Sequence, residues 1–234
     1  MNAPTIATRA AWLEARKALF EKERAMTHQL EALHAERRRL PWVRIDKRYT
    51  FQGPEGALDL DDLFGRQSQL AIYHFMLTPG SHHVCPGCSF LMDHVDAARR
   101  HFEHADLAFA AVSRASIERI EEVRQRMGWT FPWVSSGESD FNYDFGVSFT
   151  EADRAAGRAS YNYGLASISN SPDMFGISIF AKDDDGNIFH TYSTYHRGVE
   201  LLAGAFNWLD LTPKGRNEGD GTMSWVRLHD EYED

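Results

Sequence analysis

The first 40 residues carry a regular apolar pattern. Large apolar side chains recur at every seventh position, at Trp12, Leu19, Met26, Leu33 and Leu40. This spacing predicts one long helix from about residue 8 to residue 40, and Pro41 then ends it. Such a helix either packs across its own domain or serves as an arm that joins two copies in a homodimer. The pattern alone leaves both interpretations open.

Beyond Pro41, strand-like and helix-like patterns alternate. Nearly unbroken apolar runs at 70–77 (LAIYHFML) and 107–112 (LAFAAV) are typical of strands buried on both faces. Shorter patterns predict further strands at 43–51, 131–134, 176–182 and 187–194. Helical spacing predicts helices at 89–104, 116–127 and 199–209. The alternation indicates a mixed α/β class.

The same patterns suggest how the chain is divided. We expect a helical arm at 1–40, a main domain at 41–211 and a polar C-terminal tail at 212–234. Within the main domain, residues 135–172 lack a clean period and are rich in Asn, Ser, Tyr and Phe, so we interpret them as an irregular insertion.

Charge and composition narrow the classes of partner. The chain has 25 basic and 34 acidic residues, for a net charge of −9. This negative field disfavours binding to nucleic acids or to anionic membranes. No apolar run approaches the roughly 18 residues that a membrane span needs, and the polar N-terminal segment lacks the apolar core of a secretory signal. We therefore expect a cytoplasmic protein.

The chain has only two cysteines, and they form the motif Cys85-Pro86-Gly87-Cys88. The motif follows a predicted buried strand and opens a predicted helix, which is typical of redox dithiols. If the helix begins there, Cys85 is its N-cap and Pro86 takes the first helical position, where a missing N–H costs nothing. Gly87 lets the backbone approach closely. Free amides at the helix end would then stabilise a thiolate on Cys85, with Cys88 as the resolving thiol.

A histidine and a metal alternative complete the candidate chemistry. His83 lies two residues before Cys85 and is a candidate to tune its proton, although a neighbouring histidine is often incidental. Cys88, His101 and His104 come close to zinc-finger spacing. A continuous helix would place His101 about 20 Å from Cys88 along its axis, too far for a shared zinc ion. We therefore expect no metal and no other cofactor.

Three functions remain on these grounds. The first is a dithiol–disulfide oxidoreductase that acts on a disulfide-containing protein or small molecule. The second is a non-catalytic binding module in which aromatic residues of the insertion hold a ligand, namely Phe141, Tyr143, Phe145, Tyr161 and Tyr163. Those aromatics also suit a small core beneath a long loop. The third, metal binding, is the weakest.

The order of segments resembles the thioredoxin superfamily, in particular its peroxiredoxin-like branch. LAIYHFML followed by CPGC is similar to the central strand and active-site helix, and GISIFAKDDDGNIFHTYSTYHRG is similar to the closing hairpin. More closely, stretches such as CPGCSF, RMGWTFPWVSS, DFNYDFGVSFT and FHTYSTYHRG resemble a bacterial family known as domain of unknown function 899. The resemblance implies a thioredoxin-like three-layer sandwich, with Cys85 as nucleophile and Cys88 as resolving thiol.

Two departures from the superfamily pattern affect this expectation. The superfamily usually places a cis-proline before the closing hairpin, and here that place falls near Gly176 or Ile177. The peroxidatic signature has Thr or Ser three residues before the first cysteine, where this chain has His82. Dithiol exchange is therefore favoured over peroxidase chemistry. Arg114 follows the strand at 107–112, and we expect it either near the dithiol or on the surface.

Overall fold

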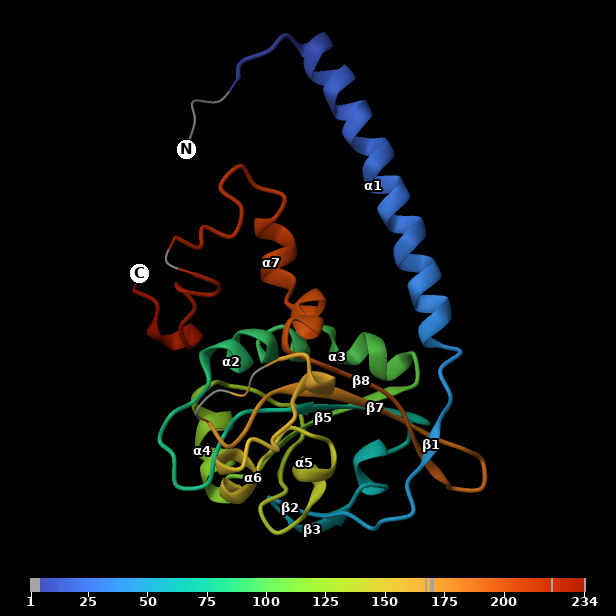
Figure 1. Ribbon diagram of the computed structural model, residues 1–234, viewed down its shortest axis with the longest axis vertical. Helices are drawn as coiled ribbons and strands as arrows, with labels where there is room; N and C mark the ends of the chain where they lie inside the picture. The colour runs from blue at the N-terminus through green and yellow to red at the C-terminus, as the bar shows by residue number, and fades with distance from the viewer. Residues whose placement is uncertain (1–4, 167, 169–170, 220, 234) are drawn as a thin grey trace. The chain divides into compact units, whose positions relative to one another are not determined.

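The computed structural model describes residues 5–166, 168, 171–219 and 221–233 (Figure 1). The chain forms two compact units, residues 1–41 and residues 42–234. Among the described residues no helix is long and apolar enough to cross a membrane.

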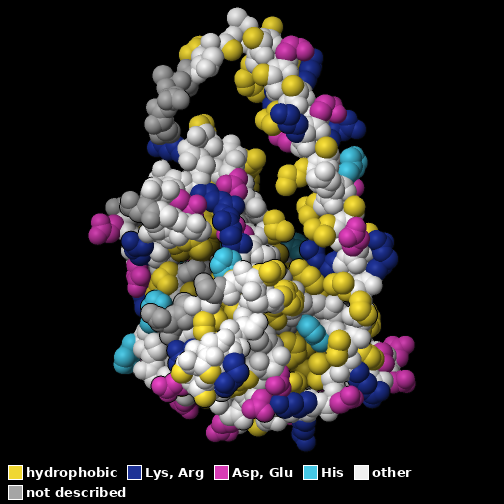
Figure 2. Space-filling view, viewed as in Figure 1, with side chains coloured by type: hydrophobic (Ala, Val, Ile, Leu, Met, Phe, Trp, Pro, Cys, Tyr) yellow, Lys and Arg dark blue, Asp and Glu magenta, His cyan; other side chains and the backbone are white. Residues whose placement is uncertain are grey.

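The first unit is built on one long helix, α1 (Arg9–Arg37). Its N-cap is Thr8, whose side chain accepts a hydrogen bond from the backbone N–H of Ala11. The predicted helix is confirmed, although it ends three residues earlier than its last apolar position. None of its residues is buried. Figure 2 shows apolar side chains along α1, and Trp12, Leu19, Met26 and Leu33 are all exposed.

The second unit is organised around one eight-stranded sheet with the order β1-β8-β7-β4-β5-β6-β2-β3. Its strands are β1 (Val43–Arg44), β2 (Thr50–Gly53), β3 (Gly56–Asp59), β4 (Gln69–His74), β5 (Leu107–Ser113), β6 (Trp133–Ser135), β7 (Gly176–Lys182) and β8 (Ile188–Tyr195). The central strands β4, β5 and β6 are parallel, whereas β7 and β8 form an antiparallel hairpin beside β4. The expected mixed α/β class is confirmed, and this connectivity is consistent with a thioredoxin-like fold.

Helices connect and cover these strands. Beside α1 they are η1 (Asp62–Phe64), α2 (Pro86–Met92), α3 (Val95–His104), α4 (Ile117–Arg126), α5 (Phe141–Asp144), α6 (Glu151–Ala155), η2 (Asn162–Gly164), η3 (His196–Leu202), α7 (Gly204–Leu209) and η4 (His229–Glu231). Each of the crossovers from β4 to β5 and from β5 to β6 is helical, as parallel neighbours require.

The central strands separate two hydrophobic cores. Tyr73 and Phe109 face a cluster with residues from α2, α3 and α4, while Leu70 and Ile72 face the opposite cluster. That second cluster is closed by Phe64 of η1 and Phe141 of α5. A full helical layer therefore covers one face only, and single turns and loops cover the other. The observed layering therefore fits the expected three-layer sandwich only loosely.

The prediction of one strand at 43–51 is wrong. Residues 43–44 pair with β8 near one edge of the sheet, and residues 50–53 pair with β3 and β6 near the other. Between them, the side chains of Lys47 and Tyr49 bind Asp144 of α5 at 2.7 and 2.8 Å. These tertiary hydrogen bonds draw the middle of the segment away from the sheet.

Two predicted helices are interrupted. The helix expected at 89–104 breaks at Asp93 and His94, where Trp129 Nε1 donates to Asp93 at 2.8 Å and the backbone N–H of Ala205 donates to His94 Nε2 at 3.0 Å. The helix expected at 199–209 divides at Ala203, whose ψ of 85° is not helical. In both places, contacts from distant segments outweigh the local helical pattern.

The insertion and the C-terminal segment both pack into the second unit. Within the insertion, Phe141 and Phe145 join the core opposite α2, and Tyr161 belongs to a smaller cluster with Val147. Tyr163, by contrast, is 70% exposed. At the C-terminal end, Val226 is buried against α2 and α7. The described residues of both segments therefore contribute to the hydrophobic clusters of the second unit.

Candidate dithiol site

The dithiol lies at the N-terminus of α2, as the sequence predicts. Cys85 is the N-cap, with extended backbone angles (φ −63°, ψ 113°), and Pro86 occupies the first turn. The backbone N–H of Cys88 donates to Cys85 Sγ at 3.3 Å. The hydroxyl of Ser89 donates to the carbonyl of Cys85 at 3.0 Å, which fixes the start of the helix further. Both cysteines are free thiols.

The two sulfurs have opposite acid–base properties. A hydrogen bond from the Cys88 thiol lowers the pKa of Cys85, burial opposes this, and the backbone N–H groups of Cys88 and Gly87 lower the pKa further. Burial raises the pKa of Cys88, and the adjacent Cys85 adds to that rise. Cys85 is partly exposed, whereas Cys88 is only 1% exposed. Cys85, the more accessible of the two, is therefore the thiol that ionises more readily.

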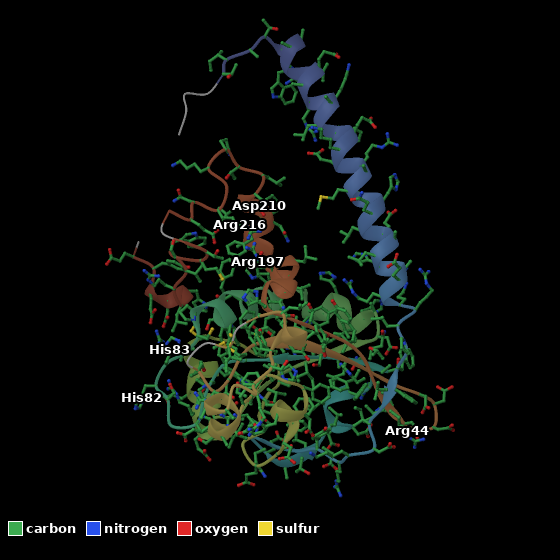
Figure 3. All side chains as sticks on the ribbon, viewed as in Figure 1. Arg44, His82, His83, Arg197, Asp210 and Arg216 are labelled. Atoms are coloured by element: carbon green, nitrogen blue, oxygen red, sulfur yellow. The ribbon has the colours of Figure 1, made fainter. Side chains whose placement is uncertain are left out.

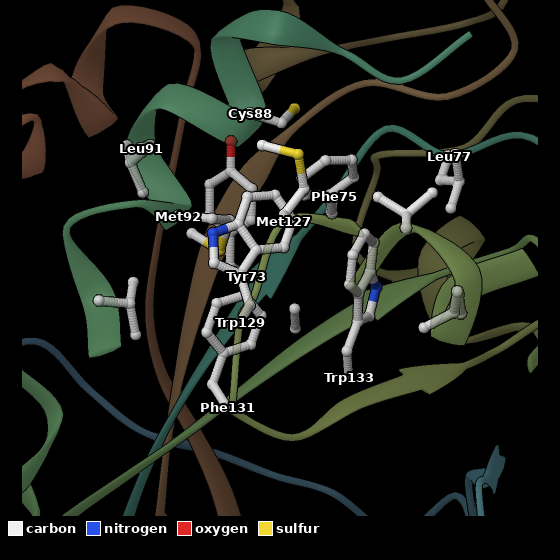
Figure 4. Close-up of a cluster of buried hydrophobic side chains, with 14 of the residues drawn as sticks. Tyr73, Phe75, Leu77, Cys88, Leu91, Met92, Met127, Trp129, Phe131 and Trp133 are labelled. Carbon is white, nitrogen blue, oxygen red and sulfur yellow. The ribbon is translucent and has the colours of Figure 1, made fainter. Parts of the chain in front are cut away.

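Tyr73 on β4 is a third member of the site that sequence reasoning missed. Figure 4 shows its hydroxyl reaching toward Cys88 from the core below α2. A hydrogen bond between Tyr73 and the Cys88 sulfur lowers the pKa of Cys88, against the larger effect of burial. Burial raises the pKa of Tyr73, so the hydroxyl stays protonated and can donate. The available signal was a tyrosine inside a buried apolar strand, because such a hydroxyl needs a partner.

A cavity of about 400 Å³ opens next to the dithiol. Its walls come from α2, from the residue before β7, from η3 and α7, and from the C-terminal segment. The lining residues are Tyr73, Cys85, Gly87, Cys88, Phe90, Leu91, Phe175, His196, Arg197, Val199, Glu200, Ala203, Phe206, Thr222 and Met223. The site thus combines an accessible thiol with a largely apolar chamber.

Gly87 has a specific packing role in this chamber. A Cβ atom at Gly87 would lie 3.4 Å from the terminal methyl carbon of Met223. Met223 of the C-terminal segment therefore packs close over Gly87, at the distance of an ordinary van der Waals contact from a Cβ atom there. The sequence indicated a close backbone approach at Gly87 but not which segment makes it.

The other two predicted site residues lie elsewhere. His83 is exposed on the loop before α2 (Figure 3), and its backbone N–H donates to Ser81 Oγ at 3.2 Å. Arg114 is bound in the interior by Asp173, through hydrogen bonds of 2.6 and 3.0 Å, and also donates to the Tyr143 hydroxyl at 2.7 Å. Neither residue is part of the cavity wall at the dithiol. A tuning role for His83 stays a prediction.

Asp173 links Arg114 to the loop that precedes the dithiol. Its carboxylate also accepts hydrogen bonds of 2.6 Å from the hydroxyls of Thr78 and Ser148. The Asp173 side chain is 3% exposed, so this is a buried ion pair with additional donors. The cluster connects the insertion to the loop between β4 and α2 and to the residue after β5. Arg114 therefore acts on the architecture around the dithiol and not on the sulfurs themselves.

The position where the superfamily usually has a cis-proline is occupied here by Gly176. The described residues contain no cis peptide bond. A Cβ atom at Gly176 would lie 2.3 Å from Cδ1 of Tyr195, so the pairing of β7 with β8 excludes any side chain there, proline included. The preceding residue, Phe175, lines the cavity instead.

The part of the chain that the structure describes contains no group of three or more His, Cys, Asp or Glu side chains able to hold a metal ion.

Comparison with known proteins identifies the family. The chain matches the family described as "Bacterial protein of unknown function (DUF899)" over residues 1–232, and it therefore belongs to that family. No curated protein gives a significant match.

Several solved structures are similar to this chain. One is the peroxidoxin BcpB from Mycobacterium tuberculosis, with 11% identity over 73% of this chain and 96% of that protein, and a TM-score of 0.43. Another is the mitochondrial 2-Cys peroxiredoxin from Plasmodium falciparum, with 16% identity over 70% and 92%, and a TM-score of 0.42. A third is a cysteine-to-serine mutant of PrxQ from Xylella fastidiosa, with 17% identity over 70% and 89%, and a TM-score of 0.42.

Proposed function

We propose that this protein is a thiol–disulfide oxidoreductase in which Cys85 is the nucleophile and Cys88 the resolving thiol. One observation carries the proposal. The sulfur of Cys85 caps α2 and accepts the backbone N–H of Cys88, and its pKa is lowered while that of Cys88 is raised. Disulfide exchange requires a thiolate on the attacking sulfur, and this arrangement favours its formation on the sulfur that a substrate can reach.

The reaction has two steps. The Cys85 thiolate attacks one sulfur of a substrate disulfide, forming a Cys85–substrate disulfide and releasing the other sulfur as a thiolate, which takes up a proton. Cys88 then loses its proton and attacks Cys85, which forms the Cys85–Cys88 disulfide and releases the second substrate thiol. The protein is oxidised by two electrons and the substrate is reduced by two.

Tyr73 is a positioning residue for the second step. Cys88 is buried, and burial raises its pKa, so its thiolate needs a hydrogen-bond donor when it forms. The Tyr73 hydroxyl lies on the core side of Cys88 and supplies that bond. Its pKa is raised, so it remains a donor across the physiological range.

The two half-reactions can be separated by trapping. The Cys88→Ser variant should accumulate a mixed disulfide on Cys85 when mixed with a disulfide substrate, which mass spectrometry of the intact protein detects. The matched Cys85→Ser variant should accumulate none, because Cys88 is buried and protonated. Equal trapping in both variants, or trapping only through Cys88, would contradict the assigned roles.

We also propose a cytoplasmic location for this activity. A chain whose only two cysteines are three positions apart, in a redox motif and not in structural crosslinks, suits a reducing compartment. A cellular reductant there would return the Cys85–Cys88 disulfide to the dithiol after each turnover.

A further inference from the structure

The cavity beside the dithiol is hydrocarbon over most of its wall. Apolar side chains reach it from separate parts of the fold: Phe90 of α2, Phe175 before β7, Val199 of η3, Phe206 of α7 and Met223 near the C-terminus. Its volume of about 400 Å³ lies within the range of roughly 300–1,000 Å³ typical of small-molecule sites. The exposed sulfur of Cys85 is the reactive group on this wall. The chamber is therefore suited to a small molecule that carries apolar groups.

Apart from the Cys85 thiolate, the charged side chains at the cavity are already paired with one another. Among the described lining residues, Arg197 and Glu200 are the two with full charges, and they pair with each other at 3.0 Å. Glu200 also pairs with Arg216 at 3.3 Å, and Arg216 with Asp210 at 2.9 Å. Figure 3 shows Arg197, Arg216 and Asp210 on the same side of the molecule. An anionic ligand would lose its hydration here without gaining a free counter-charge, because the one unpaired charge in the described part of the cavity wall is the Cys85 thiolate itself.

The C-terminal wall is anchored in place. The backbone N–H of Met223 donates to Glu218 Oε1, and Trp225 Nε1 donates to the carbonyl of Arg216 at 2.7 Å. Val226 is 4% exposed in the cluster with Phe90. This segment covers the surface over Gly87 that a folded protein substrate would need to approach. The chamber therefore favours a free small molecule over a disulfide held in a protein.

We infer that the substrate of the dithiol is a small, uncharged disulfide with apolar substituents, which binds in this cavity next to Cys85. The inference rests on the proposed function and specifies its substrate class. The substituents contact Phe175, Val199 and Phe206, and this contact places the substrate sulfur against the Cys85 thiolate. The two substrate thiols leave as neutral molecules after each takes up one proton.

A matched pair of substrates tests the inference. The reduced full-length chain is mixed with dipropyl disulfide, with dithiodipropionate, which has the same carbon chain but two carboxylates, or with insulin. Each rate is divided by the rate at which free dithiothreitol reduces the same disulfide, which removes differences in intrinsic reactivity. We expect the normalised rate with dipropyl disulfide to exceed the other two at least about tenfold, which is roughly 1.4 kcal/mol of transition-state stabilisation.

The outcomes separate this inference from the proposed function. Equal or higher normalised rates with dithiodipropionate or insulin would overturn the substrate class and leave the oxidoreductase intact. Normalised rates no greater than one with all three disulfides would refute the oxidoreductase itself, and the substrate class with it.

Two variants test the cavity directly. Thr222 is an exposed lining residue, so Thr222→Trp narrows the mouth without disturbing the core. We expect it to slow the reaction with dipropyl disulfide at least about tenfold while leaving the Cys85 pKa unchanged. Lys214→Trp is the matched control, because Lys214 is exposed in the same segment and lies outside this cavity. An unaltered rate in Thr222→Trp, or an equal loss in the control, would overturn the inference.

Discussion

Arg114 holds Asp173 through two hydrogen bonds, Nε to Oδ1 at 2.6 Å and Nη2 to Oδ2 at 3.0 Å. Both partners are largely buried, with side-chain exposures of 13% and 3%. This pair joins the residue after β5 to the segment before β7, and through Thr78 it also fixes the loop that leads to the dithiol. Through these hydrogen bonds, the insertion helps to hold the loop that leads to the dithiol in place.

Replacing Asp173, one partner of this ion pair, should lower the free energy of unfolding substantially. Asp173→Ala leaves the Arg114 charge buried and removes the acceptor of Thr78 and Ser148. Removal of one partner of a buried ion pair typically costs about 3–5 kcal/mol, and we expect a loss of free energy of unfolding in that range by urea titration. The matched control is Arg126→Ala, which breaks the more exposed pair with Asp230 and should cost much less. Equal losses in both variants would contradict the structural role of Asp173.

A buried histidine should make stability depend on pH. His74 is fully buried between Ser178 and the ring of Phe141, and burial lowers its pKa to about 3. In the unfolded chain its pKa is about 6.5, so the unfolded state binds more protons below that value. Its contribution to stability is therefore fully present above about pH 6.5 and is lost as the pH falls toward 3.

The size of this effect follows from the two pKa values. Between pH 7 and pH 5, His74 should account for about 2 kcal/mol of lost stability. His74→Gln keeps a hydrogen-bonding group beside Ser178 but does not titrate in this range. Urea unfolding of both proteins at the two pH values measures the difference. The same pH dependence in wild type and variant would show that His74 is not the responsible group.

Tyr73→Phe should slow the second step of exchange selectively. The variant removes the hydroxyl that hydrogen-bonds to the Cys88 sulfur while keeping the ring in the core. A hydrogen bond worth about 1 kcal/mol corresponds to roughly a fivefold slower resolution of the mixed disulfide. Rapid-quench mass spectrometry resolves formation from decay of the mixed disulfide. Slower formation with unchanged decay would place Tyr73 in the first step instead.

The exposed stripe on α1 should join two copies of the chain. Its apolar residues repeat every seven positions, which is the signature of paired helices, and Leu19 and Met26 lie at its centre. We expect the wild type to sediment as a dimer at micromolar concentration and Met26→Glu to sediment as a monomer. Lys22→Glu alters a charge on the same helix outside the stripe and should remain a dimer. A monomeric wild type would contradict this expectation.

Local sequence patterns correctly predicted a buried strand, a hairpin and the start of a helix. The buried strand predicted at 70–77 is confirmed as β4, although it ends at His74, and the hairpin of β7 and β8 and the start of α2 after Cys85 are also confirmed. These features depend on apolar runs, turn residues and a proline at the first helical position, all of which are readable within a short window.

The features that the sequence did not reveal depend on contacts between distant residues. The break between α2 and α3 requires Asp93 to bind Trp129, which lies 36 positions away. One wall of the cavity forms because Met223 packs over Gly87. The Tyr73 hydroxyl meets the Cys88 sulfur only because α2 packs above β4. Spacing along one segment carries no information about such partners. The placement of Cys85 and Cys88 at the start of a helix was therefore predictable, whereas the groups around them were not.

The most direct test of the account is a titration of the Cys85 thiolate by its ultraviolet absorbance in the reduced protein, with Cys85→Ser as the blank. We predict one thiolate with a pKa below the ordinary value of about 8.5, assigned to Cys85 because the blank lacks it, and a rise in that pKa in Cys88→Ala. A Cys85 pKa at or above 8.5, or a low-pKa thiolate that persists in Cys85→Ser, would contradict the central claim.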